Sequence, residues 1–251
     1  MHRVHEGNLR GRLQLPRCGR ARGGFLRLLV RGVPVRRLLV VVSLAAVFAG
    51  CAPCEPRPNL GLYKQQLVGW HDSGDYERCF AQAARRGEAA LDRAIASTQP
   101  RQQMAVVFDI DETLLSNWEY LTAKGFGFQV DTFFAWVRTH SDPALAPTKA
   151  IYDKARAAGI PIYLISGRVE SLRVDTVRQL KAAGLTGWSG LFLKPDNYSQ
   201  PSIVPFKSGV RRKLTEAGQV IVLNMGDQFS DLEGGYARTA VKLPNPYYYI
   251  R

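Results

Sequence analysis

The feature that most constrains the fold is a series of four short apolar runs separated by stretches of helical composition. The runs are apolar at consecutive positions, which is typical of strands buried on both faces of a parallel sheet. Three helical stretches end at glycines placed to cap them, Gly159, Gly184 and Gly218. This alternation predicts an α/β fold with a Rossmann-like, doubly wound parallel sheet. The runs are 105–108, 160–165, 191–193 and 220–223, and the helical stretches are 147–158, 169–183 and 206–217.

Two segments do not fit a simple repeat of strand and helix. About fifty residues separate the first two runs, far more than a crossover needs. We interpret residues from about 114 to 158 as a small helical cap insert over the carboxyl edge of the sheet, where α/β proteins bind ligands. The aromatic residues of this segment could line a site or simply pack the insert. Residues 76–96 predict an N-terminal helical extension, with Asp72 or Ser73 as its cap.

The net charge of +13 is concentrated at the beginning of the chain. Residues 1–50 hold ten arginines and one acid, whereas the remainder carries 24 basic and 20 acidic residues. We therefore expect no nucleic-acid partner for the folded part. The apolar run 38–49 is too short to span a bilayer and follows two arginines, as in a signal peptide.

Residues 48–51, Phe-Ala-Gly-Cys, resemble the lipobox of bacterial lipoproteins. The resemblance implies a lipid on Cys51 and a membrane-anchored protein of the bacterial cell envelope. Residues 51–60 themselves look like a tether. An ordinary signal peptide is the alternative. Residues 1–34 are too long and too rich in arginine for a signal peptide, so we expect the chain to begin at Val35. Cys54 and Cys79 could pair in an oxidising compartment or remain two thiols.

The strongest chemical signal is the sequence FDIDETLLSN, which follows the first apolar run. Asp109 and Asp111 are two residues apart at the predicted carboxyl end of a strand and can face the same cleft. One carboxylate can attack phosphorus while the other transfers a proton to the leaving oxygen. Capping of a following helix would explain one of these acids but not both.

Two further residues are candidates for phosphate binding. Ser166 follows the second run, where a hydroxyl at a helix N-terminus suits a phosphate oxygen or, equally, a capping box. Lys207 would offset negative charge on a phosphoryl group. It stands among other basic residues, Arg211, Arg212 and Lys213, and such a cluster is commonly a solvated helix face.

A second pair of acids follows the fourth run. Asp227 and Asp231 are four residues apart, so one helical turn would bring both towards the same cleft. Carboxylate ligands without neighbouring histidine or cysteine favour Mg²⁺ over zinc.

Taken together, FDIDETLLSN, LISGR, FKSGVRRKL, GDQFSDL and KLPNPYYYI resemble the haloacid-dehalogenase (HAD) acid phosphatases of the class-B-like group. This group includes plant acid phosphatases and vegetative storage proteins, and is related to bacterial lipoprotein acid phosphatases with 5'-nucleotidase activity. The resemblance implies a HAD-like phosphatase domain over residues 61–251.

The same resemblance implies roles for individual residues. Asp109 is expected to form a phospho-aspartate, with Asp111 as general acid and base. Ser166 and Lys207 are expected to bind phosphate. Mg²⁺ is expected to be held by the residues Asp109, Asp111 (through its carbonyl), Asp227 and Asp231.

The expected function is Mg²⁺-dependent hydrolysis of small phosphate monoesters, with nucleoside monophosphates as first candidates. A catalytically weak surface or binding lipoprotein on the same fold, and a phosphotransferase, are the alternatives. The sequence leaves the oligomeric state open.

Overall fold

The computed structural model describes residues 59–250. The predicted signal peptide, the lipidation of Cys51 and the pairing of Cys54 with Cys79 therefore fall wholly or partly outside the described residues. Within residues 59–250, no helix combines the length and apolar character that a membrane crossing requires.

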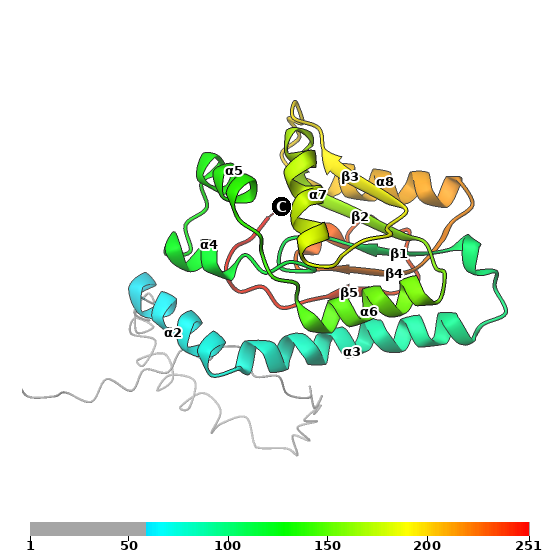
Figure 1. The fold of residues 1–251 in the computed structure, drawn as a ribbon, viewed down its shortest axis with the longest axis horizontal. Coiled ribbons are helices and arrows are strands. Elements are labelled where there is room, and N and C mark those ends of the chain that lie inside the picture. The colour runs from blue at the N-terminus through cyan, green and yellow to red at the C-terminus, as the bar shows by residue number, and fades with distance from the viewer. Residues whose placement is uncertain (1–58, 251) are drawn as a thin grey trace, which may run out of the picture. The chain divides into compact units, whose positions relative to one another are not determined.

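Five parallel strands form one sheet in the order β3-β2-β1-β4-β5. The chain first builds outwards from β1 to β3, then returns to the other side of β1, so a topological switch point lies between β1 and β4 (Figure 1). The predicted doubly wound parallel sheet is confirmed. Its strands are β1 (Met104–Phe108), β2 (Ile162–Val169), β3 (Gly190–Lys194), β4 (Val220–Gly226) and β5 (Ala240–Lys242).

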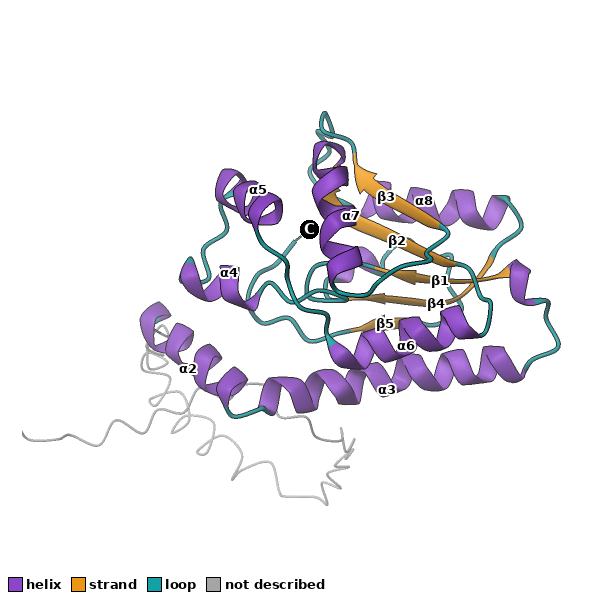
Figure 2. Ribbon diagram, viewed as in Figure 1, coloured by secondary structure: helices purple, strands orange, loops and turns teal. Residues whose placement is uncertain are grey.

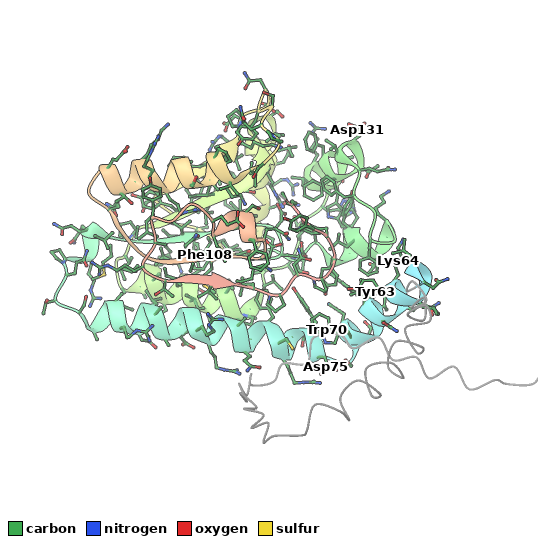
Figure 3. The ribbon with its side chains drawn as sticks, turned by 180° about the vertical axis from the view of Figure 1, so that it is seen from behind. Tyr63, Lys64, Trp70, Asp75, Phe108 and Asp131 are labelled. Carbon is green, nitrogen blue, oxygen red and sulfur yellow. The ribbon has the colours of Figure 1, made fainter. Side chains whose placement is uncertain are left out.

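Helices cover both faces of this sheet (Figure 2). On one face, Val210 and Leu214 of α8 (Val204–Glu216) form a core cluster with Ala105 and Val107 of β1. On the other face lie α3 (Asp75–Ala96) and α6 (Ala146–Ala157), where the ring of Phe108 contacts that of Tyr152. Figure 3, seen from behind, labels Phe108 within the fold. Alternate side chains of β1 thus enter different halves of the core.

The pairing of β4 with β1 contains one irregularity. Ala105 pairs with Ile221 but Val106 pairs with Leu223, so Val222 is an extra residue. Such a bulge reverses which face the following side chains meet. Ile221 accordingly belongs to the cluster under α8. Met225, further along the strand, lies instead against α3.

The remaining helices are α2 (Leu60–Asp72), α4 (Trp118–Ala123), α5 (Val130–Thr139) and α7 (Arg173–Ala182), with short 3₁₀ turns η3 (Arg101–Gln103), η4 (Glu170–Leu172) and η5 (Phe229–Asp231). The three predicted capping glycines all have positive φ angles, 69°, 74° and 90°. The predicted cap of α3 was wrong. Its N-cap is Gly74, in the left-handed region, and no side chain caps it.

The long segment between β1 and β2 contains three helices, α4, α5 and α6, which do not all lie on the same side of the sheet's strands. α4 and α5 lie on the side towards which the strand arrows point (Figure 2). α6 instead packs against α3 and β2, as a crossover helix does. Only the first two helices of the segment predicted as an insert, residues 114–158, therefore cover the carboxyl edge of the sheet.

Candidate active site

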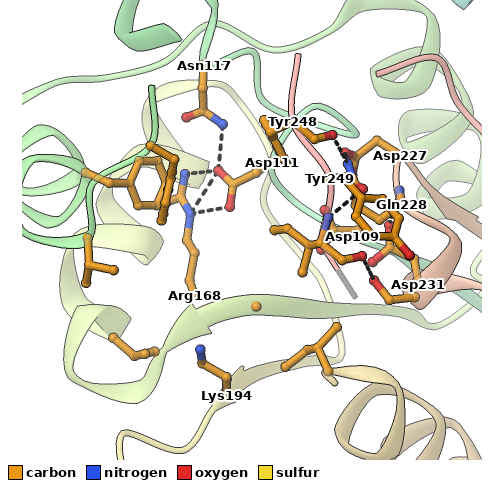
Figure 4. A pocket seen from close by; sticks show the side chains of 18 of the residues that line it. Asp109, Asp111, Asn117, Arg168, Lys194, Asp227, Gln228, Asp231, Tyr248 and Tyr249 are labelled. Atoms are coloured by element: carbon orange, nitrogen blue, oxygen red, sulfur yellow. Dashed lines mark hydrogen bonds and ion pairs between the residues drawn. The ribbon is translucent and has the colours of Figure 1, made fainter. Parts of the chain in front are cut away.

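A cavity of about 400 Å³ opens at the carboxyl ends of β1, β2 and β4 (Figure 4). Four aspartates and three cationic side chains contribute to its lining: Asp109, Asp111, Asp227, Asp231, Arg168, Lys194 and Lys207. Its other walls are largely aromatic and come from α4, α5, the loop between these helices and the segment after β5. They include Tyr120, Phe128, Phe133, Phe134, Tyr248 and Tyr249. A charged floor beneath apolar walls is typical of a site for a small ligand.

Asp109 directly follows β1 and is held by the sheet and by one lysine. Its N–H donates to the carbonyl of Met225 on β4 at 3.0 Å. Lys207 Nζ donates to its Oδ1 at 2.7 Å, and both side chains are buried. Burial raises the pKa of Asp109 well above its ordinary value, against the opposing effect of Lys207, and the neighbouring aspartates raise it further.

Asp111 lies two residues further and faces a different set of partners. Arg168 donates to Oδ1 from Nη2 at 2.7 Å and to Oδ2 from Nε at 3.0 Å. Asn117 Nδ2 donates to Oδ1 at 2.8 Å. Burial alone would raise the pKa of Asp111, but the guanidinium and these hydrogen bonds outweigh it and lower the pKa below its ordinary value.

Lys207 also links Asp109 to Asp231. Its ammonium donates to Asp231 Oδ1, and the N–H of Gln228 donates to Oδ2 at 2.8 Å. Both oxygens of Asp231 are therefore engaged within the protein. The attractions of the two aspartates outweigh burial and raise the pKa of Lys207, so this lysine is a cation at any working pH.

Arg211 lies one helical turn beyond Lys207 on α8 and is 1% exposed. It donates to the carbonyls of Asp231 and Gly235, at 2.6 and 2.9 Å. Lys207 and Arg211 therefore do not belong to a solvated helix face. Lys207 faces the cavity, and Arg211 holds the loop after β4 in place.

Asp227 follows β4 across the switch point from Asp109. Gln228 Nε2 and Asn245 Nδ2 each donate to its Oδ2 at 2.6 Å, and Thr113 Oγ1 donates to Oδ1 at 3.3 Å. Burial, with the charge of Asp231, raises the pKa of Asp227 to about 7.

The carboxylates fit a divalent cation. One oxygen from each of Asp109, Asp227 and Asp231 lies within 4.8 Å of the others, and all three residues are buried. Lys207 is the one cation bonded to this trio among the described residues, so excess negative charge remains. Oxygen donors are those that Mg²⁺ prefers. The carboxylate of Asp111 is bonded to Arg168 instead. This agrees with the expectation that Asp111 would bind the metal ion through its backbone carbonyl and not through its carboxylate.

Ser166 lies within β2 and not at a helix N-terminus, because the strand continues to Val169 and α7 begins at Arg173. It is fully buried, and its hydroxyl accepts a hydrogen bond from the N–H of Arg168 at 3.1 Å. It is not among the residues that line the cavity. Its predicted phosphate contact therefore stays a prediction. Gly167 and Arg168 of the same LISGR motif do line the cavity. Sequence reasoning missed Arg168.

Glu112 is a buried acid near the cavity that the sequence analysis did not single out. Its carboxylate accepts from the N–H and the Nδ2 of Asn117, at 2.8 and 2.9 Å. Burial raises its pKa to about 8. Because Asn117 also donates to Asp111, Glu112 orients a partner of the catalytic candidate rather than lining the cavity itself.

Gly226, at the end of β4, has no room for a side chain. A Cβ there would lie 2.3 Å from the Cβ and Oδ2 of Asp231, which Lys207 and Gln228 hold. We expect Gly226→Ala to lower the free energy of unfolding by about 1–3 kcal/mol, measured by urea denaturation. As a control, Gly209→Ala within α8 meets nothing within 4 Å and should raise it by about 0.5–1 kcal/mol. Equal stability of the two variants would contradict this packing.

The family model described as HAD superfamily, subfamily IIIB (Acid phosphatase), matches residues 59–251. The chain belongs to this family. The predicted resemblance to HAD acid phosphatases is thereby confirmed, and the five motifs that carried it all lie within the matched residues.

Two curated proteins that this member of the family resembles come from plants. Over 148 residues the chain is 39% identical to vegetative storage protein 1 of Arabidopsis thaliana, covering 57% of this chain and 54% of the relative. It is 38% identical to acid phosphatase 1 of Solanum lycopersicum, covering 57% and 58%. The matches thus span little more than half the length of these curated relatives.

Among solved structures, the class C acid phosphatase from Bacillus anthracis has the same fold, with a TM-score of 0.60. The likeness covers 75% of this chain and 87% of that one, at 23% identity.

Proposed function

We propose that this chain is a Mg²⁺-dependent acid phosphatase that hydrolyses phosphate monoesters through a phospho-aspartate. The observation that carries the proposal is the position of Asp109. Its buried carboxylate stands at the switch point of the sheet, between Lys207 and the carboxylate pair Asp227 and Asp231.

In the first step, an oxygen of Asp109 forms a bond to phosphorus while the bond from phosphorus to the ester oxygen breaks. The departing oxygen takes a proton from Asp111. Lys207 stays beside Asp109 and reduces the repulsion between its carboxylate and the phosphoryl oxygens.

In the second step, the ionised Asp111 removes a proton from water as the water oxygen attacks phosphorus. The bond from phosphorus to Asp109 breaks, and inorganic phosphate leaves. Bound Mg²⁺, held by Asp109, Asp227, Asp231 and the carbonyl of Asp111, would supply positive charge to the phosphoryl group.

The cavity walls favour a leaving group with a flat ring. Tyr120 and Phe133 stand edge to face with centroids 5.3 Å apart, so part of the aromatic wall packs on itself. Phe128 and Tyr249 are exposed at 53% and 70% and remain available for contact. Aromatic faces stack on nucleobases. Nucleoside monophosphates are therefore the first substrates to test.

The test is phosphate release from a panel of monoesters by the purified chain with Mg²⁺. We expect hydrolysis, with kcat/KM higher for nucleoside and aryl monophosphates than for glycerol phosphate. Transfer of phosphate to added alcohol in place of water would favour a phosphotransferase. Nucleotide binding without turnover would favour a storage or binding protein on this fold.

A further inference from the structure

Arg168 is a buried cation that the proposed mechanism does not use. It is 3% exposed and stands at the end of β2, where its guanidinium faces the carboxylate of Asp111 (Figure 4). It donates to both oxygens of this carboxylate, to Oδ1 from Nη2 and to Oδ2 from Nε. This bidentate contact fixes the position of the carboxylate and also its rotation about the Cβ–Cγ bond.

The other side of the guanidinium is fixed by α7 and α5. Nη1 donates to Gln179 Oε1 at 2.6 Å, and the ring of Phe133 lies 5.8 Å from Cζ. Gln179 Nε2 in turn donates to Asp142 Oδ2 and to the carbonyl of His140, both at 3.0 Å. Because both amide hydrogens of Gln179 face acceptors, its oxygen must face Arg168.

Asp142 connects this chain of contacts to the α5 segment. Its Oδ1 accepts from Trp136 Nε1 at 2.8 Å, and the residue is buried. The contacts therefore run without a break from α5 through Asp142, Gln179 and Arg168 to Asp111. Each polar group along this path has a partner on either side, so the guanidinium of Arg168 is held both by Asp111 and by Gln179.

We propose that Arg168 is the positioning residue of Asp111, and that it holds this carboxylate where it can exchange a proton with the leaving oxygen. The inference rests on the proposed function, because it gives Asp111 the acid and base role. Arg168 itself need not touch the substrate. A lysine at this position would keep the positive charge. Its ammonium would not reproduce the planar, bidentate pair of hydrogen bonds that the guanidinium donates to the carboxylate.

The test uses the dependence of rate on the leaving group. Proton donation matters for alkoxide leaving groups and little for a stable phenolate, so a misplaced acid affects the two unequally. For Arg168→Gln and Arg168→Lys, we expect kcat/KM with glycerol 2-phosphate to fall about 10²-fold, and with 4-nitrophenyl phosphate less than about fivefold. Equal losses on both substrates would overturn the proposal, since they indicate a structural or phosphate-binding role.

A double-mutant cycle separates this role from the mechanism as a whole. Adding Arg168→Gln to Asp111→Asn should cost almost nothing further, because the group to be positioned is already absent. Full additivity would contradict the proposal. Wild-type rates in Asp111→Asn alone would instead refute the proposed function of Asp111, which makes the two failures distinguishable.

Arg178, which lies on α7 beside Gln179, offers a matched control. It donates to the carbonyls of Val137 and His140 at 2.7 and 3.0 Å, and thus anchors the same segment without contacting Asp111. Arg178→Gln should lower both rates equally or leave both unchanged. Leaving-group selectivity in Arg178→Gln would show that loosening the insert is enough to misplace Asp111, and would overturn a specific role for Arg168.

Mg²⁺ affinity, measured by calorimetry, should be the same in Arg168→Lys and the wild type.

Discussion

Asp109→Asn should lower phosphatase activity at least about 10³-fold while the chain still folds. The amide of asparagine is a poor nucleophile, so the covalent step fails. Folding should survive because the substitution removes one of several negative charges from a buried cluster, and Lys207 keeps Asp231 as a partner. Phosphate release under saturating substrate and circular dichroism of the same sample provide the two measurements.

Asp153→Asn is the matched control for Asp109→Asn. Asp153 lies on α6 and pairs at the surface with Lys149, at 2.6 Å. We expect full activity from this variant. Substantial turnover in Asp109→Asn would rule out the phospho-aspartate, whatever the control shows.

Removal of divalent cations with EDTA should abolish activity, and added Mg²⁺ should restore it. The physical reason is the excess of buried negative charge. Without a cation, burial and the charge of Asp231 raise the pKa of Asp227 to about 7, so protons compete for the site that a cation would otherwise occupy. Activity that persists after exhaustive chelation would contradict a metal role for these carboxylates.

A binding measurement supports the same prediction without relying on turnover. A ligand that binds only the folded state stabilises it, so Mg²⁺ should raise the melting temperature of the wild-type chain. Asp227→Asn should weaken this shift, because it removes one donor from the cluster of three. An equal shift in both proteins would place the bound ion elsewhere.

The central strands and the motif residues were accessible to sequence reasoning for a simple reason. Strands such as β1 are buried on both faces, so every position from Met104 to Phe108 is buried and apolar. Parallel strands also end at one edge of the sheet, so residues directly after β1 and β4 are expected at the same edge. Asp109 and Asp227 could therefore be placed at that edge before any coordinates were known. The structure makes β1 and β4 neighbours.

Other features left weaker signals in the sequence. β5 has three residues and only Val241 buried fully, so no run of apolar residues marks it. The cap of α3 was misplaced because Ser73 uses its hydroxyl on Trp70 and Asp75, and Gly74 takes the capping position by its backbone conformation. Arg168 was overlooked because one arginine after a strand has no distinctive pattern.

The sequence by itself determined the class of fold, the family and the acids that meet at the candidate site, because burial on both faces of a strand and the alternation of strands with helices produce local patterns. Lipid attachment at Cys51 stays a prediction, since it falls outside the described residues. Only the tertiary structure decided how the side chains are paired. Lys207 contacts both Asp109 and Asp231, although Lys207 and Asp109 are about a hundred positions apart in the sequence. Arg168 binds the carboxylate of Asp111 from about sixty positions away. These residues meet because the strands that carry them end at one edge of the sheet. No local pattern encodes which of several neighbouring cations reaches which carboxylate.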